Sequence, residues 1–215
     1  MRAVPRTFAI AMWALIWTAS VAHAQVGDGA YGRLDGDLAL SIAGGGALVL
    51  GERGGPDPTG SATLELRARV LDSAGVVVAP EWRPEGTSRL VLAIDLRPVF
   101  LARFLLNGES GRAWVDLMID SIGLDLGAAL VLGREGDVGA GVAVGLGLDV
   151  PLYEPSPGDP LVALRVAWRW VGALPADAVG VDGGASDSAL ILAVVVRGLV
   201  DAGIASREAP RYRVR

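Results

Sequence analysis

The side chains best suited to acid–base or metal chemistry are almost absent from this chain. It contains no cysteine, and its only histidine is His23, close to the N-terminus. Beyond that point, mechanisms in which histidine acts as the general base are therefore excluded. Zinc and haem sites that depend on His or Cys ligands are excluded for the same reason. We expect no catalytic residue, no metal site, no cofactor and no enzymatic activity.

Carboxylates are the groups on which an enzyme mechanism would still have to depend. Asp116 and Asp120 are four residues apart, which puts both on one face if this segment is a helix. Ion pairing with arginine, or a solvated helix edge, explains such a pair more simply, because ion-pair networks commonly imitate active sites. We interpret Asp35 and Asp37 in the same way, as partners for arginine. Carboxylate-only catalysis stays open without being our prediction.

Glycine-rich stretches offer no ligand site by their pattern. Gly44-Gly45-Gly46 lacks the Lys and Ser or Thr that follow in a phosphate-binding loop, and no Asp/Gly loop has the spacing of a calcium site. The three glycines predict either a tight hairpin turn or a bend within one long strand.

The chain contains no lysine, so all 19 of its Lys or Arg residues are arginines. Several of these arginines recur at alternate positions, so they share one face of a strand. If that face lines an interior, they would attract a small anion. The ligand-binding candidates are Arg67, Arg69, Arg165, Arg169 and Arg197.

Alternation of residue types is plainest between residues 122 and 150. Aliphatic residues fill every second position from Ile122 to Leu132 and again from Ala140 to Val150, with mostly Gly, Ala and isolated Asp between them. The sequence Gly-Arg-Glu-Gly-Asp at 133–137 separates the two runs. A period of two places alternate residues on opposite faces of a strand. The segment therefore predicts a β-hairpin with one aliphatic face and one small or polar face.

The same alternation recurs along the chain in shorter segments. Between these segments, clusters of Gly, Pro, Asp and Ser predict loops, and residues 72–75 predict a turn or a bulge. The predicted strands cover 33–42, 47–50, 62–70, 76–78, 89–97, 161–170 and 189–197, and the predicted loops cover 51–60, 80–87, 151–160 and 172–187.

Residues 98–120 break the period of two. Pro98 favours the first turn of a helix, and Trp114, Leu117 and Met118 have helical spacing. Val115, Leu117 and Ile119 would equally fit a strand, because short apolar runs discriminate poorly. We expect a short helix pair here, with strands as the alternative.

Charged residues fall on only one face of the predicted strands. No charge lies on any aliphatic face, as expected of a membrane barrel, in which an Arg or Lys at mid-bilayer costs about 2–4 kcal/mol. Assigned by phase, the charged face holds Asp35, Asp37, Glu65, Asp95, Asp125 and Asp149 together with Arg33, Arg67, Arg69, Arg89, Arg97, Arg165, Arg169 and Arg197.

The second face decides between a soluble and a membrane barrel. A water-facing side would carry Lys, Glu, Thr and Gln, whereas the 122–150 hairpin offers chiefly Gly, Ala and isolated Asp, which suit a narrow lumen. In this patterning the chain resembles the small outer-membrane β-barrel proteins of Gram-negative bacteria. The resemblance implies an all-β fold: a closed antiparallel transmembrane barrel of about eight strands, with aliphatic side chains towards lipid.

The N-terminal 24 residues have the features of a secretory signal peptide. Arg2 and Arg6 flank its start, the apolar run at 8–17 is too short to span a bilayer, and Ala22-His23-Ala24 supplies a small-x-small cleavage site. A retained anchor is the alternative. We predict a signal peptide at 1–24, an outer-membrane barrel domain at 25–200 and a polar tail at 201–215.

Charge and location limit the partners of the mature chain. The whole chain has a net charge of −5 and no basic tract, so nucleic acid is excluded as a partner and outer-membrane lipid is expected. Our first hypothesis is a structural or interaction protein whose lumen is filled by Arg–carboxylate pairs and by the 98–120 segment. The alternatives are a narrow barrel that binds or transports an anion or small ligand, and a soluble periplasmic lipid-binding barrel.

Overall fold

The computed structural model describes residues 36–50, 58–84, 88–106, 108, 110, 112–132, 138–155, 159–173 and 186–204. The predicted signal peptide, Arg33 and Asp35 lie outside the described residues. So does most of the predicted tail, of which 201–204 are described and exposed.

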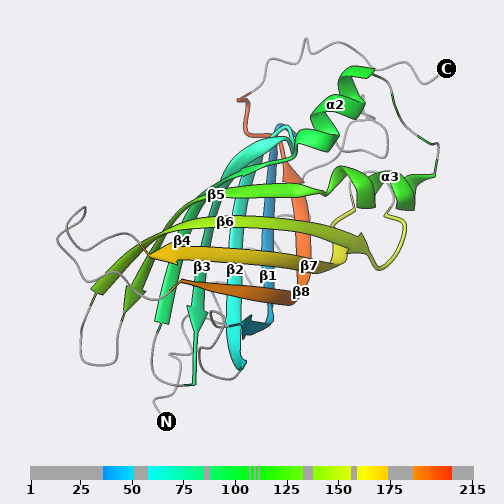
Figure 1. Cartoon of the computed structure of the whole chain (residues 1–215). Helices are drawn as coiled ribbons and strands as arrows, with labels where there is room; N and C mark the ends of the chain where they lie inside the picture. The colour runs from blue at the N-terminus through cyan, green and yellow to red at the C-terminus, as the bar shows by residue number, and fades with distance from the viewer. Residues whose placement is uncertain are drawn as a thin grey trace, which may run out of the picture.

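Eight antiparallel strands form a closed barrel, in which each strand pairs with its neighbours in the chain and β1 pairs with β8. The predicted closed barrel of about eight strands is confirmed. Strands on opposite walls cross at a steep angle (Figure 1), because barrel closure requires tilted strands. The strands are β1 (Leu38–Leu50), β2 (Thr59–Val70), β3 (Ala74–Trp82), β4 (Ser88–Leu96), β5 (Gly123–Leu132), β6 (Val138–Pro151), β7 (Leu161–Ala173) and β8 (Asp187–Val200).

Exposure alternates along each strand with the period that the sequence predicts. In β6, residues at odd positions from Gly139 to Pro151 are buried, and those between them are partly or fully exposed. The odd positions face the lumen and the even positions face outward. The hairpin predicted at 122–150 is confirmed as β5 and β6, joined by residues 133–137.

Strands extend into all four predicted loops, and furthest into those at 80–87 and 172–187. Pro80, Glu81 and Trp82 complete β3 instead of opening a loop, and Pro80 pairs in register with Leu90 of β4. The register between β2 and β3 skips Pro80, which has no N–H to donate to the ladder. The loop predicted at 172–187 is also shortened, because β7 continues to Ala173 and β8 begins at Asp187.

The glycine triplet lies inside β1, so the bend within one strand is confirmed. A Cβ on Gly45 would lie 2.1 Å from the carbonyl oxygen of Leu192 on β8. A Cβ on Gly127 of β5 would lie 2.1 Å from the carbonyl oxygen of Leu92 on β4. Because β1–β8 and β4–β5 are on opposite sides of the barrel, these glycines allow close backbone approach at two opposite corners.

Residues 71–73 form a tight turn between β2 and β3, so the predicted turn, and not the bulge, is confirmed. The Ser73 N–H donates to the Val70 carbonyl oxygen at 3.0 Å. Leu71 (φ +49°) and Asp72 (φ +50°) both have left-handed backbone conformations, as a type I′ hairpin turn requires.

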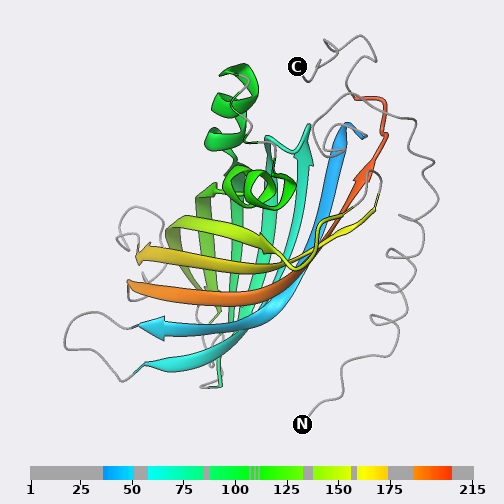
Figure 2. The same cartoon turned by 90° about the vertical axis from the view of Figure 1, so that its right-hand side faces the viewer.

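Helices α2 (Pro98–Leu106) and α3 (Ala113–Asp120) occupy the connection between β4 and β5, and the predicted helix pair is confirmed. Both helices lie beyond the strands at one end of the barrel, which we call the helix end (Figures 1 and 2). The expectation that this segment fills the lumen is therefore wrong. Neither described helix is long and apolar enough to cross a membrane.

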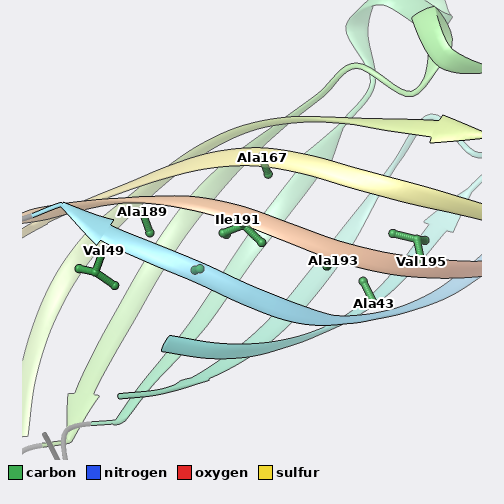
Figure 3. Packing of buried hydrophobic residues seen from close by; sticks show 8 residues of the cluster. Ala43, Val49, Ala167, Ala189, Ile191, Ala193 and Val195 are labelled. Atoms are coloured by element: carbon green, nitrogen blue, oxygen red, sulfur yellow. The ribbon is translucent and has the colours of Figure 1, made fainter. Parts of the chain in front are cut away.

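Small apolar residues pack inside the barrel near the two corners. One cluster joins β1, β7 and β8 (Figure 3) and contains Ala43, Ala47, Val49, Ala167, Ala189, Ile191, Ala193 and Val195. The other joins β3 to β7 and contains Val77, Ala79, Val91, Ala93, Ala129, Ala143 and Val171.

Candidate functional site: the ion-paired lumen

The five arginines predicted as ligand candidates all lie buried in the lumen. Their strands bring them to one interior because all occupy inward positions of β2, β7 or β8. Each arginine is next to at least one carboxylate from another strand or turn, so the lumen already contains its counter-ions. These five are Arg67, Arg69, Arg165, Arg169 and Arg197.

Glu65 of β2 is the centre of the arrangement. Its carboxylate lies 2.9 Å from Arg67 Nη2, 3.0 Å from Arg165 Nε and 2.5 Å from Arg169 Nη2. Because Arg165 and Arg169 belong to β7, this single fully buried carboxylate connects two walls of the barrel.

Arg67 connects the same centre to two further strands. Its guanidinium donates to both carboxylate oxygens of Asp125 on β5, at 2.7 and 2.8 Å, and to Asp95 on β4 at 2.8 Å. The contact with Asp125 is bidentate, which is the most directional form of an Arg–carboxylate pair. Arg69 Nε reaches the same Asp95 oxygen at 2.6 Å.

Towards the helix end, the ion pairs continue through the β2–β3 turn. Asp72 lies 2.9 Å from Arg97 and 2.5 Å from Arg197. Arg97 also contacts Asp149 of β6 at 3.1 Å, and Asp149 lies 2.9 Å from Arg165. The charged turn residue is therefore joined to the centre by alternating cations and anions.

Towards the opposite end, Arg169 pairs with Glu81 of β3. Glu81 lies 2.5 Å from Arg89, which lies 2.8 Å from Asp187 at the start of β8. Arg83 then contacts Asp187 at 2.6 Å. The resulting series, which we call the lumenal ion-pair chain, runs without interruption through Arg197, Asp72, Arg97, Asp149, Arg165, Glu65, Arg169, Glu81, Arg89, Asp187 and Arg83.

Positive and negative charges are nearly balanced in the lumenal ion-pair chain together with Arg67, Arg69, Asp95 and Asp125, which pair beside it. Burial disfavours isolated charges, and pairing with hydrogen bonding offsets that cost. Arg97, which lies just beyond β4, illustrates the competition: burial lowers the pKa of its guanidinium, and Asp72 opposes that shift. An arginine in these surroundings remains charged, so its carboxylate partners are needed.

Four members of the chain are not on the charged face that the sequence predicted: Asp72, which was placed in a turn, and Glu81, Arg83 and Asp187. Glu81 continues the inward phase of Val77 and Ala79, but Pro80 masked the strand. Asp187 similarly continues the phase of Ala189. If the alternation had been continued past Pro80 in β3, and back from Ala189 in β8, both carboxylates would have been assigned to the inward face.

Asp116 and Asp120 do lie on one buried face of α3, as their spacing predicted. Both carboxylates pair with Arg103 of α2, with 2.9 Å between Arg103 Nη1 and Asp120. Asp116 also accepts a hydrogen bond from the Ser110 N–H at 3.0 Å. This geometry ties the two helices together.

Asp37 lies just before β1, close to the place where β1 pairs with β8 and closes the barrel. Its carboxylate accepts hydrogen bonds from the backbone N–H groups of Ala202, at 2.6 Å, and of Ile204. Its carbonyl oxygen accepts from the Leu71 N–H at 2.9 Å. Asp37 therefore joins the start of β1 to the β2–β3 turn and to the residues after β8.

Comparisons with known proteins found only distant similarity. No family model and no curated protein matches the chain. Similar solved structures include a designed protein called TMB2.3 (14% identity, TM-score 0.38, covering 75% of this chain and 94% of that one). The outer membrane protein OprG from Pseudomonas aeruginosa shows 15% identity and a TM-score of 0.40, with 75% and 96% covered.

Ail, the attachment invasion locus protein of Yersinia pestis, shows 12% identity and a TM-score of 0.39, with 75% and 99% covered. These similarities are weak, so the assignment of this chain rests on its own geometry.

Proposed function

We propose that the mature chain is an integral outer-membrane β-barrel of structural or interaction type, with a lumen closed by ion pairs. The main observation behind this proposal is that the outer surface of the barrel is apolar. Within the strand ranges given above, no outward position carries a charge, and most are aliphatic. The half-exposed side chains include Leu48, Leu66, Val76, Leu92, Ile94, Leu126, Val142, Leu146, Val166, Leu190, Leu192 and Val194.

An apolar surface of this extent has a physical meaning. Soluble monomers rarely expose contiguous apolar patches larger than a few hundred Å². Here the apolar surface covers the outward side of all eight strands. A closed barrel satisfies its backbone hydrogen bonds internally, which is the requirement for strands in lipid. The strands contain 9 to 14 residues, a length that spans a bilayer when tilted.

The same surface argues against a soluble lipid-binding barrel. Such a protein needs its aliphatic side chains inside and its charges outside. Here the arrangement is reversed, with buried Arg and Glu in the lumen and exposed Leu and Val outside.

The signal peptide predicted at 1–24 supports export, and the barrel topology then orients the protein. Because the strand number is even, β1 begins and β8 ends at the helix end. A chain inserted from the periplasm leaves both termini there, so we assign the helix end to the periplasm and the far end to the cell exterior.

The lumen supports an interaction role in preference to free diffusion. An eight-stranded barrel is just wide enough to be filled by its own side chains. The lumenal ion-pair chain crosses this interior from end to end, and small apolar residues occupy the corners. The function then belongs to the surfaces outside the bilayer.

Fractionation with a heat-shift gel tests the membrane assignment. We expect the full-length chain in the outer-membrane fraction, with different migration before and after boiling, because folded membrane barrels resist detergent. Recovery as a soluble periplasmic protein without a heat shift would overturn the proposal.

Conductance tests the closed lumen separately. Purified protein reconstituted in a planar phospholipid bilayer is expected to give no steady current. A steady, reproducible conductance would show that the ion pairs do not seal the interior, and would favour the narrow anion-transporting alternative with Arg67, Arg69, Arg165, Arg169 and Arg197 as its lining.

A further inference from the structure

Helix α2 is apolar on nearly every side, yet among the described residues of the helix only Phe100 is buried. Its sequence is Pro-Val-Phe-Leu-Ala-Arg-Phe-Leu-Leu. Leu101 is 41% exposed, Leu105 79% and Leu106 80%. A helix that is hydrophobic all round normally lies buried in protein or in a membrane. The exposed side of α2 therefore requires an explanation.

The only charge on α2 points towards the protein. Arg103 pairs with Asp116 and Asp120 of α3, and its Nε donates to the Gly108 carbonyl oxygen at 3.1 Å. Phe100 is buried, and its ring centroid lies 6.0 Å from that of Phe104. The polar group is thus used for holding the helix pair together, and what remains on the exposed side is Leu and Ala.

The position of α2 relates it to the apolar outer surface of the barrel. The helix begins two residues after Leu96, the last outward position of β4. Its start is fixed because the Arg97 N–H donates to the Ser73 carbonyl oxygen at 2.7 Å, which ties it to the β2–β3 turn. Figures 1 and 2 show α2 beyond the ends of the strands, at the helix end of the barrel.

An aromatic residue on the neighbouring helix has the character of an interfacial side chain. The Trp114 ring is 39% exposed, while its Nε1–H donates to the Pro151 carbonyl oxygen at 2.7 Å. Tryptophan with a satisfied N–H and a partly exposed ring is typical of the headgroup region of membranes.

We propose that α2 rests in the phospholipid surface of the periplasmic leaflet, with Leu101, Leu105 and Leu106 at the boundary between headgroups and acyl chains. This inference rests on the proposed membrane location of the barrel. Continuity with the lipid-facing surface favours lipid over a protein partner as the occupant. Amphipathic helices bind such interfaces by burying an apolar face to a depth of about 5–10 Å.

The absence of cysteine from the sequence allows a direct test. We would introduce Leu105→Cys, or Leu101→Cys as a second position, and attach an environment-sensitive fluorophore to the folded protein in phosphatidylcholine vesicles. Quenching by a nitroxide on the lipid acyl chain reports contact with lipid, and quenching by iodide reports contact with water.

Two matched positions calibrate the measurement. Arg112→Cys lies on the exposed connection between the helices, and Leu92→Cys lies outward at the middle of β4. We expect the α2 labels to resemble Leu92 in being quenched by lipid, with iodide quenching several-fold lower than at Arg112. A shallow nitroxide position should quench the α2 labels more than the Leu92 label.

The outcomes separate the two proposals. If iodide quenches the Leu105 and Leu101 labels as strongly as the Arg112 label while Leu92 is shielded, the barrel is in the membrane and the inference about α2 is wrong. If iodide also reaches Leu92, the membrane assignment itself fails.

Discussion

The two faces of the barrel wall share the same strands but obey different rules. Outward residues such as Leu92 and Leu126 are 45% and 42% exposed, and the property that outward residues share is the lack of charge. Inward residues such as Glu65 and Arg67 have named partners on several strands. The outer face therefore depends on composition, whereas the inner face depends on which residue lies opposite which. Mutations on the two faces should have correspondingly different consequences.

The largest effect is expected at the centre of the lumen. Glu65→Gln would leave Arg67, Arg165 and Arg169 without the carboxylate that all three contact. Removing one partner of a buried ion pair typically costs about 3–5 kcal/mol of unfolding free energy. Guanidinium unfolding of the protein in lipid vesicles, followed by tryptophan fluorescence, measures this loss.

Asp187→Asn is the matched control for that prediction. Asp187 also pairs with two arginines, but its side chain is 11% exposed and lies at one end of the lumen. We expect a clearly smaller loss, because water there compensates the remaining charges. Equal losses for the two variants would contradict a closed, dry centre.

A charge on the outer face is expected to be next in size. Leu92→Arg places a guanidinium at the middle of β4 and should destabilise the barrel by about 2–4 kcal/mol, falling to about 0–1 kcal/mol for Leu132→Arg at the end of β5. The same unfolding measurement applies. If both variants cost the same, depth in a bilayer does not determine the outcome, and the outer face is not facing lipid.

Two glycines of the wall provide a smaller contrast. Gly127→Ala brings a Cβ against the backbone of Leu92 and Ala93 and should cost about 1–3 kcal/mol by overpacking. Gly44→Ala meets nothing within 4 Å, so it should be neutral or stabilise by about 0.4–1 kcal/mol through the unfolded chain. Similar effects at both positions would argue against a close backbone approach at the β4–β5 corner.

The smallest predicted effect is at the turn between β2 and β3, and it is stabilising. Leu71 has a left-handed backbone (φ +49°), which Asn adopts more readily. We expect Leu71→Asn to raise the unfolding free energy by up to about 1 kcal/mol, seen as a higher denaturant midpoint. A lower midpoint would mean that the partly buried leucine side chain contributes more than the strain costs.

The sequence predicted the faces of the wall well because the period of two is a local property. The ends of β5 and β6 followed from alternation interrupted by residues 133–137. The same logic placed all five candidate arginines inside. Where a proline lay within a strand, at Pro80, the local signal failed and Glu81 was assigned to a loop.

The ion pairs across the lumen could not be predicted from the sequence. Alternation of residue types shows which face of a strand a side chain lies on, but not which residue it will contact. Arg169 contacts Glu65 and Glu81, which are 104 and 88 residues away in the chain. Such partners depend on barrel closure and on strand tilt. The helix pair at 98–120 was predicted only as one of two alternatives, since its apolar residues satisfy both periods.

The lumenal ion-pair chain also has a consequence for the order of assembly. Among the described residues, the ion pairs found for Arg169 and Arg197 join β7 and β8 to Glu65, Glu81 and Asp72, all in the first half of the chain. A growing sheet that lacks either half therefore holds unmatched charges that need hydration. We therefore expect water to stay in the interior until β1 meets β8, so that the lumen dries as the seam closes.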